Sequence, residues 1–185
     1  VRLFGGGPGG VRGAPTNLLG PRILVVRDDE TEALGCEVAA GACEGVAIDP
    51  DAVFVRSPGG EALVEGGVEA RLWVTSGILL AAFVDAGALW TGAGDDAIPG
   101  VARSESLVTP GVGIGVNTPA GPIRVDVAYD PSGARRYPLL ARDEGGASYT
   151  RLGEVIYDPY GFGDPSGAER FFRRLQLQLS MGWGF

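Results

Sequence analysis

The chain has 185 residues, a formal net charge of −8 and no histidine, and it contains 32 glycines and 13 prolines. An acidic chain of this kind is a poor candidate for nucleic-acid binding, and the lack of histidine excludes a histidine-based triad or a zinc site with histidine ligands. Glycine at more than twice its usual share of about 7% favours turns and strands over helices.

The first third of the chain is predicted to be mostly loop. Residues 1–4 resemble the end of a strand, residues 5–22 are rich in glycine and proline, and residues 23–27 form a short strand. Residues 28–62 form an acidic, glycine-rich loop that contains a short strand near residues 52–56. Because the chain begins at Val1 without a signal peptide, we expect it to be the C-terminal piece of a longer precursor.

Both cysteines of the chain, Cys36 and Cys43, lie in this acidic loop. We expect them to form a loop disulfide, made in the periplasm on the way to the outer membrane. The alternative is two unpaired thiols in an exposed loop. A metal site is the least favoured interpretation, because no other soft ligand lies near them.

The rest of the chain is predicted to form longer strands, at residues 67–75, 78–90, 107–117, 123–129 and 170–185. The connections alternate between short turns (76–77 and 118–122) and long polar loops (91–104 and 130–169). Outer-membrane barrels sort their connections in this way, with short turns at the periplasmic rim and long loops outside. No run of ~20 apolar residues predicts a transmembrane helix, which does not argue against membrane-spanning strands.

The final strand shows the clearest alternation of side chains. One of its faces carries only large apolar residues: Leu175, Leu177, Leu179, Met181, Trp183 and Phe185. The other face carries glutamine, serine and glycine, as expected for a strand between lipid and a polar lumen. The earlier strands alternate similarly, and Trp73, Trp90 and Tyr129 lie near strand ends, where aromatic girdles occur. We therefore predict an all-β fold, an antiparallel transmembrane β-barrel, whose missing strands come from upstream sequence or from other copies.

Several segments resemble, in order, the BamA/TamA family of outer-membrane protein assembly factors (the bacterial surface antigen family). They are VRGAPTNLLGP, GGVEARLWV, FVDAGALW, GVGIGVNTPAGPIRVDVAY and the terminal LQLSMGWGF. The resemblance implies the C-terminal part of a barrel of about 16 strands in the outer membrane of a Gram-negative bacterium. Residues 1–66 would be a lumen-folded loop with the VRG motif plus a long extracellular loop, and residues 67–185 the last five strands. Periplasmic POTRA domains would precede them.

The same resemblance assigns a role to the VRG loop, which in the family folds back into the lumen. It implies that Arg12 is held there by Glu69 and Asp85 on the barrel wall, while Gly13 permits the tight path of the loop tip. The alternative is a solvated Arg12 and a hydrated Asp85. The chain departs from the family at Ala14, where many members have an aromatic residue that anchors the loop tip.

The last strand carries two further expectations. Gly182 matches a family glycine that lets this strand bend inward and loosen the gate, and Phe185 is the terminal residue of the same gate strand. The alternative for Gly182 is a glycine chosen for a crowded lumen. The preceding run RFFRR (170–174) either binds lipopolysaccharide phosphates or is a solvated start of the strand.

The implied function is insertion of β-barrel proteins into the outer membrane, by addition of client strands to a lateral gate. The expected partners are outer-membrane lipid, lipopolysaccharide, unfolded β-barrel clients and periplasmic or lipoprotein accessory subunits. No catalytic residue, cofactor or metal is expected, so the chain would not be an enzyme. Two alternatives stay open: a barrel that anchors or exports a passenger protein, such as a patatin-like lipase, and a soluble β-sandwich.

Overall fold

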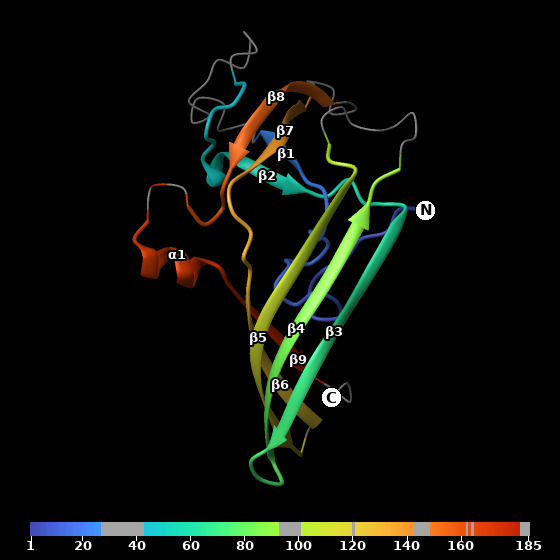
Figure 1. The fold of residues 1–185 in the computed structure, drawn as a ribbon, viewed down its shortest axis with the longest axis vertical. Coiled ribbons are helices and arrows are strands. Elements are labelled where there is room, and N and C mark those ends of the chain that lie inside the picture. The colour runs from blue at the N-terminus through green and yellow to red at the C-terminus, as the bar shows by residue number, and fades with distance from the viewer. Residues whose placement is uncertain are drawn as a thin grey trace.

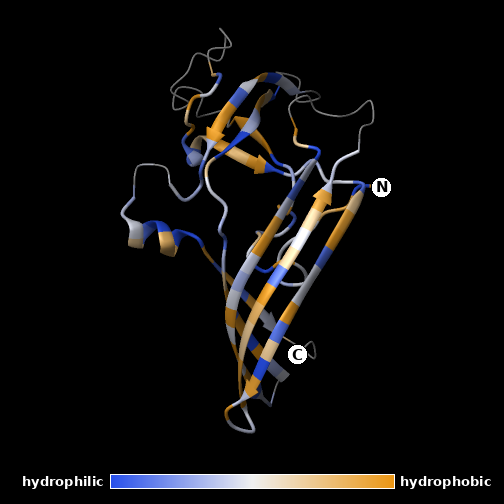
Figure 2. Ribbon diagram, viewed as in Figure 1, coloured by the Kyte–Doolittle hydropathy of each residue, from blue (hydrophilic) through white to orange (hydrophobic). Residues whose placement is uncertain are grey.

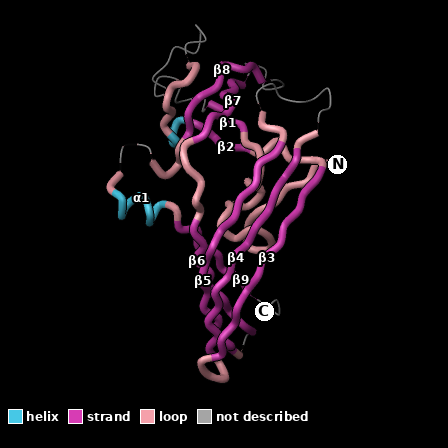
Figure 3. The backbone as a smooth tube through the Cα atoms, viewed as in Figure 1, coloured by secondary structure: helices cyan, strands magenta, loops and turns pink. Residues whose placement is uncertain are grey.

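The structure, a computed structural model, describes residues 1–26, 43–92, 101–119, 121–142, 149–161, 163 and 165–181. Two β-sheets dominate it, one of long strands and one of short strands above their upper ends (Figures 1 and 3). The single α-helix within the described ranges, α1, stands to one side between them (Figure 1).

The long sheet has five strands in the order β3-β4-β5-β6-β9, and every neighbouring pair is antiparallel. Its strands are β3 (Ala62–Trp73), β4 (Ile78–Trp90), β5 (Ser104–Thr118), β6 (Gly121–Tyr129) and β9 (Leu175–Met181). The prediction for β4 is confirmed at both ends, whereas β3 begins earlier than the predicted Gly67. The strand order follows the chain, so each connection joins two neighbouring strands. Because the neighbours are antiparallel, the connections lie at the two rims of the sheet in turn.

Three strands of this sheet, β3, β4 and β5, are longer than a bilayer needs. β5 has 15 residues, which at about 3.4 Å per residue spans about 50 Å. A tilted transmembrane strand requires about 9–11 residues. The upper ends of these strands adjoin the second sheet (Figure 1).

The outward face of the long sheet is apolar and exposed to the surroundings. Large side chains alternate there with small or polar ones, and the exposed ones include Val64, Val68, Leu72, Leu80, Val84, Val108, Val112, Ile114, Leu177 and Leu179. Figure 2 shows the resulting apolar positions along the long strands. An exposed apolar surface of this extent indicates contact with lipid or with another protein rather than with water.

The inward face of the same sheet is covered by the glycine-rich segment 5–22. Val11, Ala14 and Leu19 of this segment are buried against Leu107 of β5, with Leu63 of β3 packed beside them. Ala14, which stands where the family often has an aromatic residue, is fully buried in this cluster. The segment is therefore seated by its own small apolar core.

The second sheet has four strands in the order β2-β1-β7-β8. Its strands are β1 (Ile23–Val26), β2 (Val53–Arg56), β7 (Arg135–Arg142) and β8 (Tyr149–Tyr157), and a short 3-10 turn, η3 (Pro50–Ala52), precedes β2. Only the β1–β7 pair is parallel. The prediction that residues 130–169 form a polar loop is wrong, because β7 and β8 bury Leu139 and Val155 in a separate core.

Cys43 lies in the core of the second sheet, where it is fully buried and disulfide-bonded. Cys36 lies outside the described residues, so its pairing with Cys43 stays a prediction. Burial of Cys43 among the apolar side chains of β1 and β8 makes this cysteine part of the sheet's core rather than of an exposed loop.

The helix α1 (Gly167–Arg173) corrects a second expectation, since the sequence showed no helix signal and the last strand was predicted to start at Arg170. The hydroxyl of Ser166 caps the helix by accepting from the backbone N–H of Glu169. β9 starts only after α1, at Leu175. No helix among the described residues is long and apolar enough to cross a membrane.

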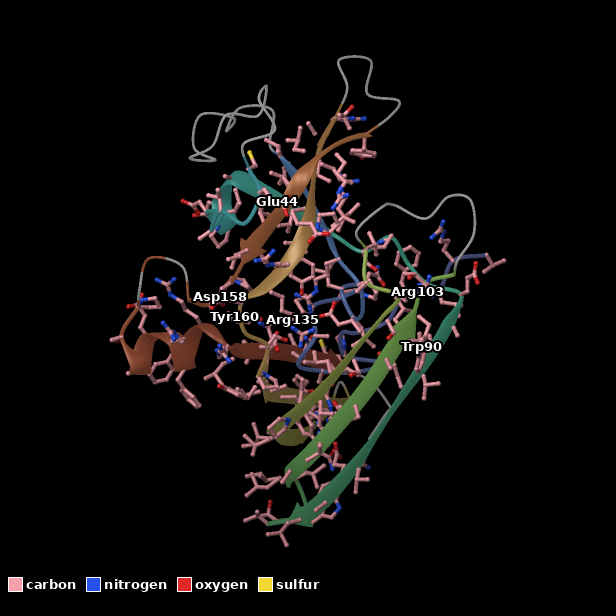
Figure 4. The ribbon with its side chains drawn as sticks, turned by 45° about the horizontal axis from the view of Figure 1, so that its top comes forward. Glu44, Trp90, Arg103, Arg135, Asp158 and Tyr160 are labelled. Carbon is pink, nitrogen blue, oxygen red and sulfur yellow. The ribbon has the colours of Figure 1, made fainter. Side chains whose placement is uncertain are left out.

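Buried polar contacts join the second sheet to the long strands. Asp130, directly after β6, is fully buried and accepts hydrogen bonds from the Tyr160 hydroxyl (2.7 Å) and the backbone N–H of Ser132 (2.8 Å). Burial and the nearby carboxylate raise the pKa of Tyr160 above its ordinary value. Figure 4 places Tyr160 and Arg135 between the second sheet and the long strands, and Arg135 is ion-paired with Glu105 of β5.

Candidate functional site

Three carboxylates converge on the inward face of the long sheet from different strands. Glu69 of β3, Asp85 of β4 and Asp126 of β6 all follow the alternation that turns charged side chains inward. Asp85 and Asp126 are buried and Glu69 is half-buried. Burying carboxylates without cations would be costly, so the site requires positive partners.

Arg12, at the tip of the segment 5–22, supplies the central cation. Its Nε and Nη2 donate to the two carboxylate oxygens of Asp85 at 2.7 and 2.8 Å, a bidentate arrangement, and its backbone N–H donates to the same carboxylate at 3.1 Å. Its Nη1 donates to Glu69 at 2.8 Å and reaches Asp126 at 3.5 Å. One arginine thus connects carboxylates on three strands.

The tip of the loop is also fixed by contacts other than ion pairs. The Arg12 guanidinium lies 3.3 Å above the centroid of the Phe83 ring, a cation–π contact. The next residue, Gly13, donates its N–H to the Thr109 hydroxyl at 3.3 Å. Gln178 of β9 donates to the backbone carbonyl of Arg12 at 3.2 Å, so the last described strand is tied to the loop as well.

A second arginine, Arg124 of β6, completes the cluster from the wall itself. Its two Nη atoms donate to both oxygens of Glu69 at 2.8 and 2.7 Å, and its Nε donates to Asp126 at 2.8 Å. Arg71 adds a more exposed pair to Glu69. The cluster therefore holds three arginines and three carboxylates, which explains how so many charges are buried together.

Charge pairing also fixes the ionisation of the loop arginine. Burial alone lowers the pKa of the Arg12 guanidinium, but its hydrogen bonds to Asp85 and Glu69 outweigh burial and raise the pKa above its ordinary value. Arg12 therefore remains charged at any physiological pH.

Glycines on the inward face leave room for these side chains. A Cβ at Gly67 would overlap the carboxylate of Asp85, and one at Gly113 would overlap that of Asp126. Gly113 is the partner of Asp126 in the β5–β6 register. The glycine content of these strands thus creates the space that the ion pairs occupy.

A second carboxylate on β3 holds the beginning of the loop. Glu65 accepts from the backbone N–H of Gly6 at 2.8 Å and of Val11 at 3.2 Å. A Cβ at Gly10 would overlap the Glu65 carboxylate, so close approach requires glycine there. Two side chains of β3, Glu65 and Glu69, therefore bind the loop at two points.

The structure brings together Arg12, Gly13, Glu69 and Asp85, the residues to which the sequence assigned loop bracing. Gly182 and Phe185, assigned to the gate strand, lie outside the described residues. Sequence reasoning missed further members of the cluster: Glu65, Phe83, Thr109, Arg124, Asp126 and Gln178. An available signal was the Arg-x-Asp spacing of 124–126, which places opposite charges on one face of a strand that otherwise carries apolar residues.

Neither the comparison with curated proteins nor that with solved structures gave a match. A family model described as the Omp85 superfamily domain matches residues 2–139, which include the loop, β3 to β6 and all the charged residues of the cluster. The match agrees with the predicted recognition and with the all-β fold. The chain belongs to the Omp85 superfamily, whose members are outer-membrane proteins.

Proposed function

We propose that this chain is the C-terminal part of a barrel that inserts and assembles β-barrel proteins in the outer membrane, with β9 at its lateral gate. Membership of the superfamily supports outer-membrane protein insertion or secretion in general. The finer assignment rests on how the sheet is arranged around the Arg12 cluster.

The observation that carries the proposal is that the two faces of the long sheet differ, and that a loop is bound to one of them. The outward face is apolar, whereas the inward face holds a buried ion-pair cluster that pins the tip of segment 5–22. A soluble β-sandwich would pack the apolar face against a second sheet, but here the apolar face of the long strands is exposed. The arrangement fits a barrel wall, with lipid outside and the loop in the lumen.

The sheet also offers a strand edge to a client. Within the described residues, β9 pairs with β6 on one side, and its other edge has no pairing partner. Main-chain groups on such an edge can bind an incoming strand by β-augmentation. The Arg12 cluster would hold β3, β4 and β6 together while the unpaired edge of β9 binds a client strand. Gln178, which donates to the Arg12 carbonyl, links β9 to the same loop.

No bond is made or broken in this mechanism, so it requires no catalytic group. Its driving force is the burial of client strands in lipid with every backbone polar group paired. The protein contributes the unpaired edge of β9, with which a client strand can pair. The rest of the sheet stays closed, because the Arg12 cluster holds its strands together.

The test is depletion of the full-length protein in its own cells, followed by quantification of folded outer-membrane barrels. We expect a broad fall in folded porins, with unfolded clients accumulating in the periplasm. Unchanged porin levels would contradict a general assembly role, and the alternative of a barrel that exports or anchors one passenger would then apply.

A further inference from the structure

A short aromatic and basic surface lies at the rim of the sheet, outside the Arg12 cluster. It is formed by α1 and the residue after it, and it contains Phe171, Phe172, Arg170, Arg173 and Arg174. No residue of α1 is buried. The exposed fractions of Phe171 and Phe172 are 49% and 67%, so the helix does not use its rings to pack into a core.

The aromatic part of this surface continues the outward face of the long sheet. The ring of Phe171 stacks on Tyr129, with centroids 5.5 Å apart and planes 25° apart, and Phe172 packs edge-on against Phe171 at 5.7 Å. Tyr129 is the last residue of β6 and lies opposite Leu175 in the β6–β9 register. It ends the outward row of apolar residues Ile123, Val125 and Val127, so α1 extends that row beyond the strand.

Hydrogen bonds hold the end of α1 against the end of β6. The carbonyl of Arg174 accepts a hydrogen bond from the backbone N–H of Asp130 at 2.9 Å, which ties the end of the helix to the end of β6. The guanidinium of Arg174 also donates to the carbonyl of Pro131 at 3.1 Å. Figure 1 shows α1 projecting sideways from the sheet, at the level where the long strands meet the second sheet.

The charge of the surface contrasts with that of the chain. Three arginines stand against one glutamate, Glu169, in a chain whose formal net charge is −8. By residue count, segment 169–174 therefore carries more positive than negative charge, and within it Arg173 is ion-paired with Glu169. Guanidinium groups bind phosphate bidentately, and aromatic rings settle at the boundary between acyl chains and headgroups.

We infer that α1 is an interfacial anchor, which inserts Phe171 and Phe172 into the outer leaflet and binds the phosphates of the surrounding lipid through its arginines. The inference rests on the proposed placement of the long sheet in the outer membrane. Short helices with apolar rings and basic side chains lie in the plane of the interface, and their affinity rises with anionic lipid. The partner is thus a phosphate-bearing lipid of the outer leaflet.

The test places a nitroxide label at single engineered cysteines in the full-length protein, reconstituted in vesicles whose outer leaflet contains diphosphorylated lipid A. Phe172→Cys reports on α1, Leu179→Cys on the outward face of β9, and Phe54→Cys on β2 of the second sheet. Phe54 serves as the control because it is an exposed phenylalanine, with an exposed fraction of 47%, that lies on the second sheet and outside the proposed anchor. Collision rates with oxygen, which concentrates in lipid, and with a nickel chelate, which stays in water, give the depth of each label.

We expect the labels at positions 172 and 179 to collide mainly with oxygen and the label at position 54 mainly with nickel. A label at position 172 that is as accessible to nickel as the label at position 54, with position 179 in lipid, would overturn the anchor while leaving the proposed function intact. If position 179 is also accessible to nickel, the placement of the sheet in the membrane fails, and the anchor fails with it.

The phosphate contact is tested on the same label. Replacing lipid A with a zwitterionic lipid should raise the nickel collision rate at position 172 several-fold, and Arg173→Gln with Arg174→Gln should remove this dependence on lipid A. Inorganic phosphate at the same concentration should have no effect, since it offers no acyl chains. A collision rate that responds to free phosphate, or that ignores both lipid and the arginine changes, would overturn lipid phosphate as the ligand. Compact migration of each variant on unheated gels shows that the barrel is folded.

Discussion

At the scale of single residues, Arg12 connects more partners than its sequence context suggests. The family resemblance led to Glu69 and Asp85, and the structure places both within hydrogen-bond distance of the guanidinium. It did not lead to Arg124 and Asp126, because the contact of Arg124 with Glu69 and that of Asp126 with Arg12 depend on how β6 registers across β5 and β4. A single sequence indicates on which face of its strand each charged side chain lies. It does not indicate which charged side chains of different strands are in contact.

Replacing Arg12 should destabilise the barrel much more than replacing Arg71, although both contact Glu69. Arg12→Gln leaves Asp85 buried without its bidentate partner, which should cost about 3 kcal/mol. Arg71 is 43% exposed on its side chain, so Arg71→Gln should cost less than about 1 kcal/mol. Urea unfolding of the full-length protein in lipid, followed by tryptophan fluorescence, measures both. Equal midpoints for the two variants would contradict the central position of Arg12.

Charge reversal gives a second test of the same cluster. Arg12→Glu places a fourth carboxylate beside Glu69, Asp85 and Asp126, so this variant should be more damaging than Arg12→Gln. Adding Asp85→Arg should restore stability only in part, because the new arginine lies near Arg124. No recovery at all in the same urea measurement would show that Asp85 is not the main partner.

The loop glycines offer a steric test with a control in the same segment. A Cβ at Gly13 would overlap the side chain of Thr109, whereas a Cβ at Gly9 would meet nothing within 4 Å. Gly13→Ala should therefore displace the loop tip and cost about 2 kcal/mol, while Gly9→Ala should be nearly neutral. Protease cleavage within residues 5–22 of the folded protein should rise for Gly13→Ala alone, and a similar rise for Gly9→Ala would contradict the seating of the tip.

At the scale of elements, the strands of the wall and the short strands β1 and β2 were predictable, whereas β7 and β8 of the second sheet were not. β4 is a nearly continuous apolar run between a short turn and a polar loop, and these flanking signals identified both its ends; in the structure its side chains alternate between exposed and buried. β7 contains Pro138 within a buried run, Tyr137–Leu140, that shows no alternation. It pairs in parallel with β1, which is more than 100 residues away. Local pattern therefore gave no signal for the pairing that stabilises it.

The helix α1 could have been predicted from its cap. Ser166 and Glu169 form a Ser-x-x-Glu pattern, which is typical of a helix N-terminus, and the Ser166 hydroxyl does accept from the N–H of Glu169. The aromatic and basic run that follows was assigned to the last strand instead. The surrounding sequence is rich in glycine and proline, which favours loops, and the helix signal covers only four residues. The helix was therefore not predicted.

The second sheet should lose stability at alkaline pH because of Tyr137. Burial, together with the negative charge of Glu105, raises the pKa of Tyr137 to about 12, and its hydroxyl donates to Glu105 at 3.2 Å. An unfolded tyrosine ionises near pH 10, so this contribution is complete below about pH 10 and is lost as the pH rises to about 12. Near-ultraviolet circular dichroism between pH 9 and 12 should show the loss.

Tyr137→Phe should reduce that alkaline step, since phenylalanine does not ionise, while Tyr157 and Tyr160, whose pKa values burial also raises, keep their contributions. Tyr149→Phe, which changes an exposed tyrosine on β8 of the same sheet, should leave the step in place. An alkaline transition of the same size in Tyr137→Phe would show that another group is responsible.

At the scale of the whole molecule, the two faces of the long sheet differ in chemical character. The outward face is apolar from β3 to β9, and the inward face buries a balanced set of charges around one loop. β3 and β9 are the outer strands of this sheet within the described residues, so the barrel requires further strands to close. The predicted total of about 16 strands remains a prediction.

The most direct test is the amount of folded porin in cells depleted of the wild-type protein and supplied with Arg12→Glu or Arg71→Gln. The proposed role of the braced wall in assembly predicts little folded porin with Arg12→Glu and near wild-type amounts with Arg71→Gln, at equal levels of each variant in the outer membrane. Folded porin restored to wild-type amounts by Arg12→Glu would contradict the claim that the Arg12 cluster holds the wall during client insertion.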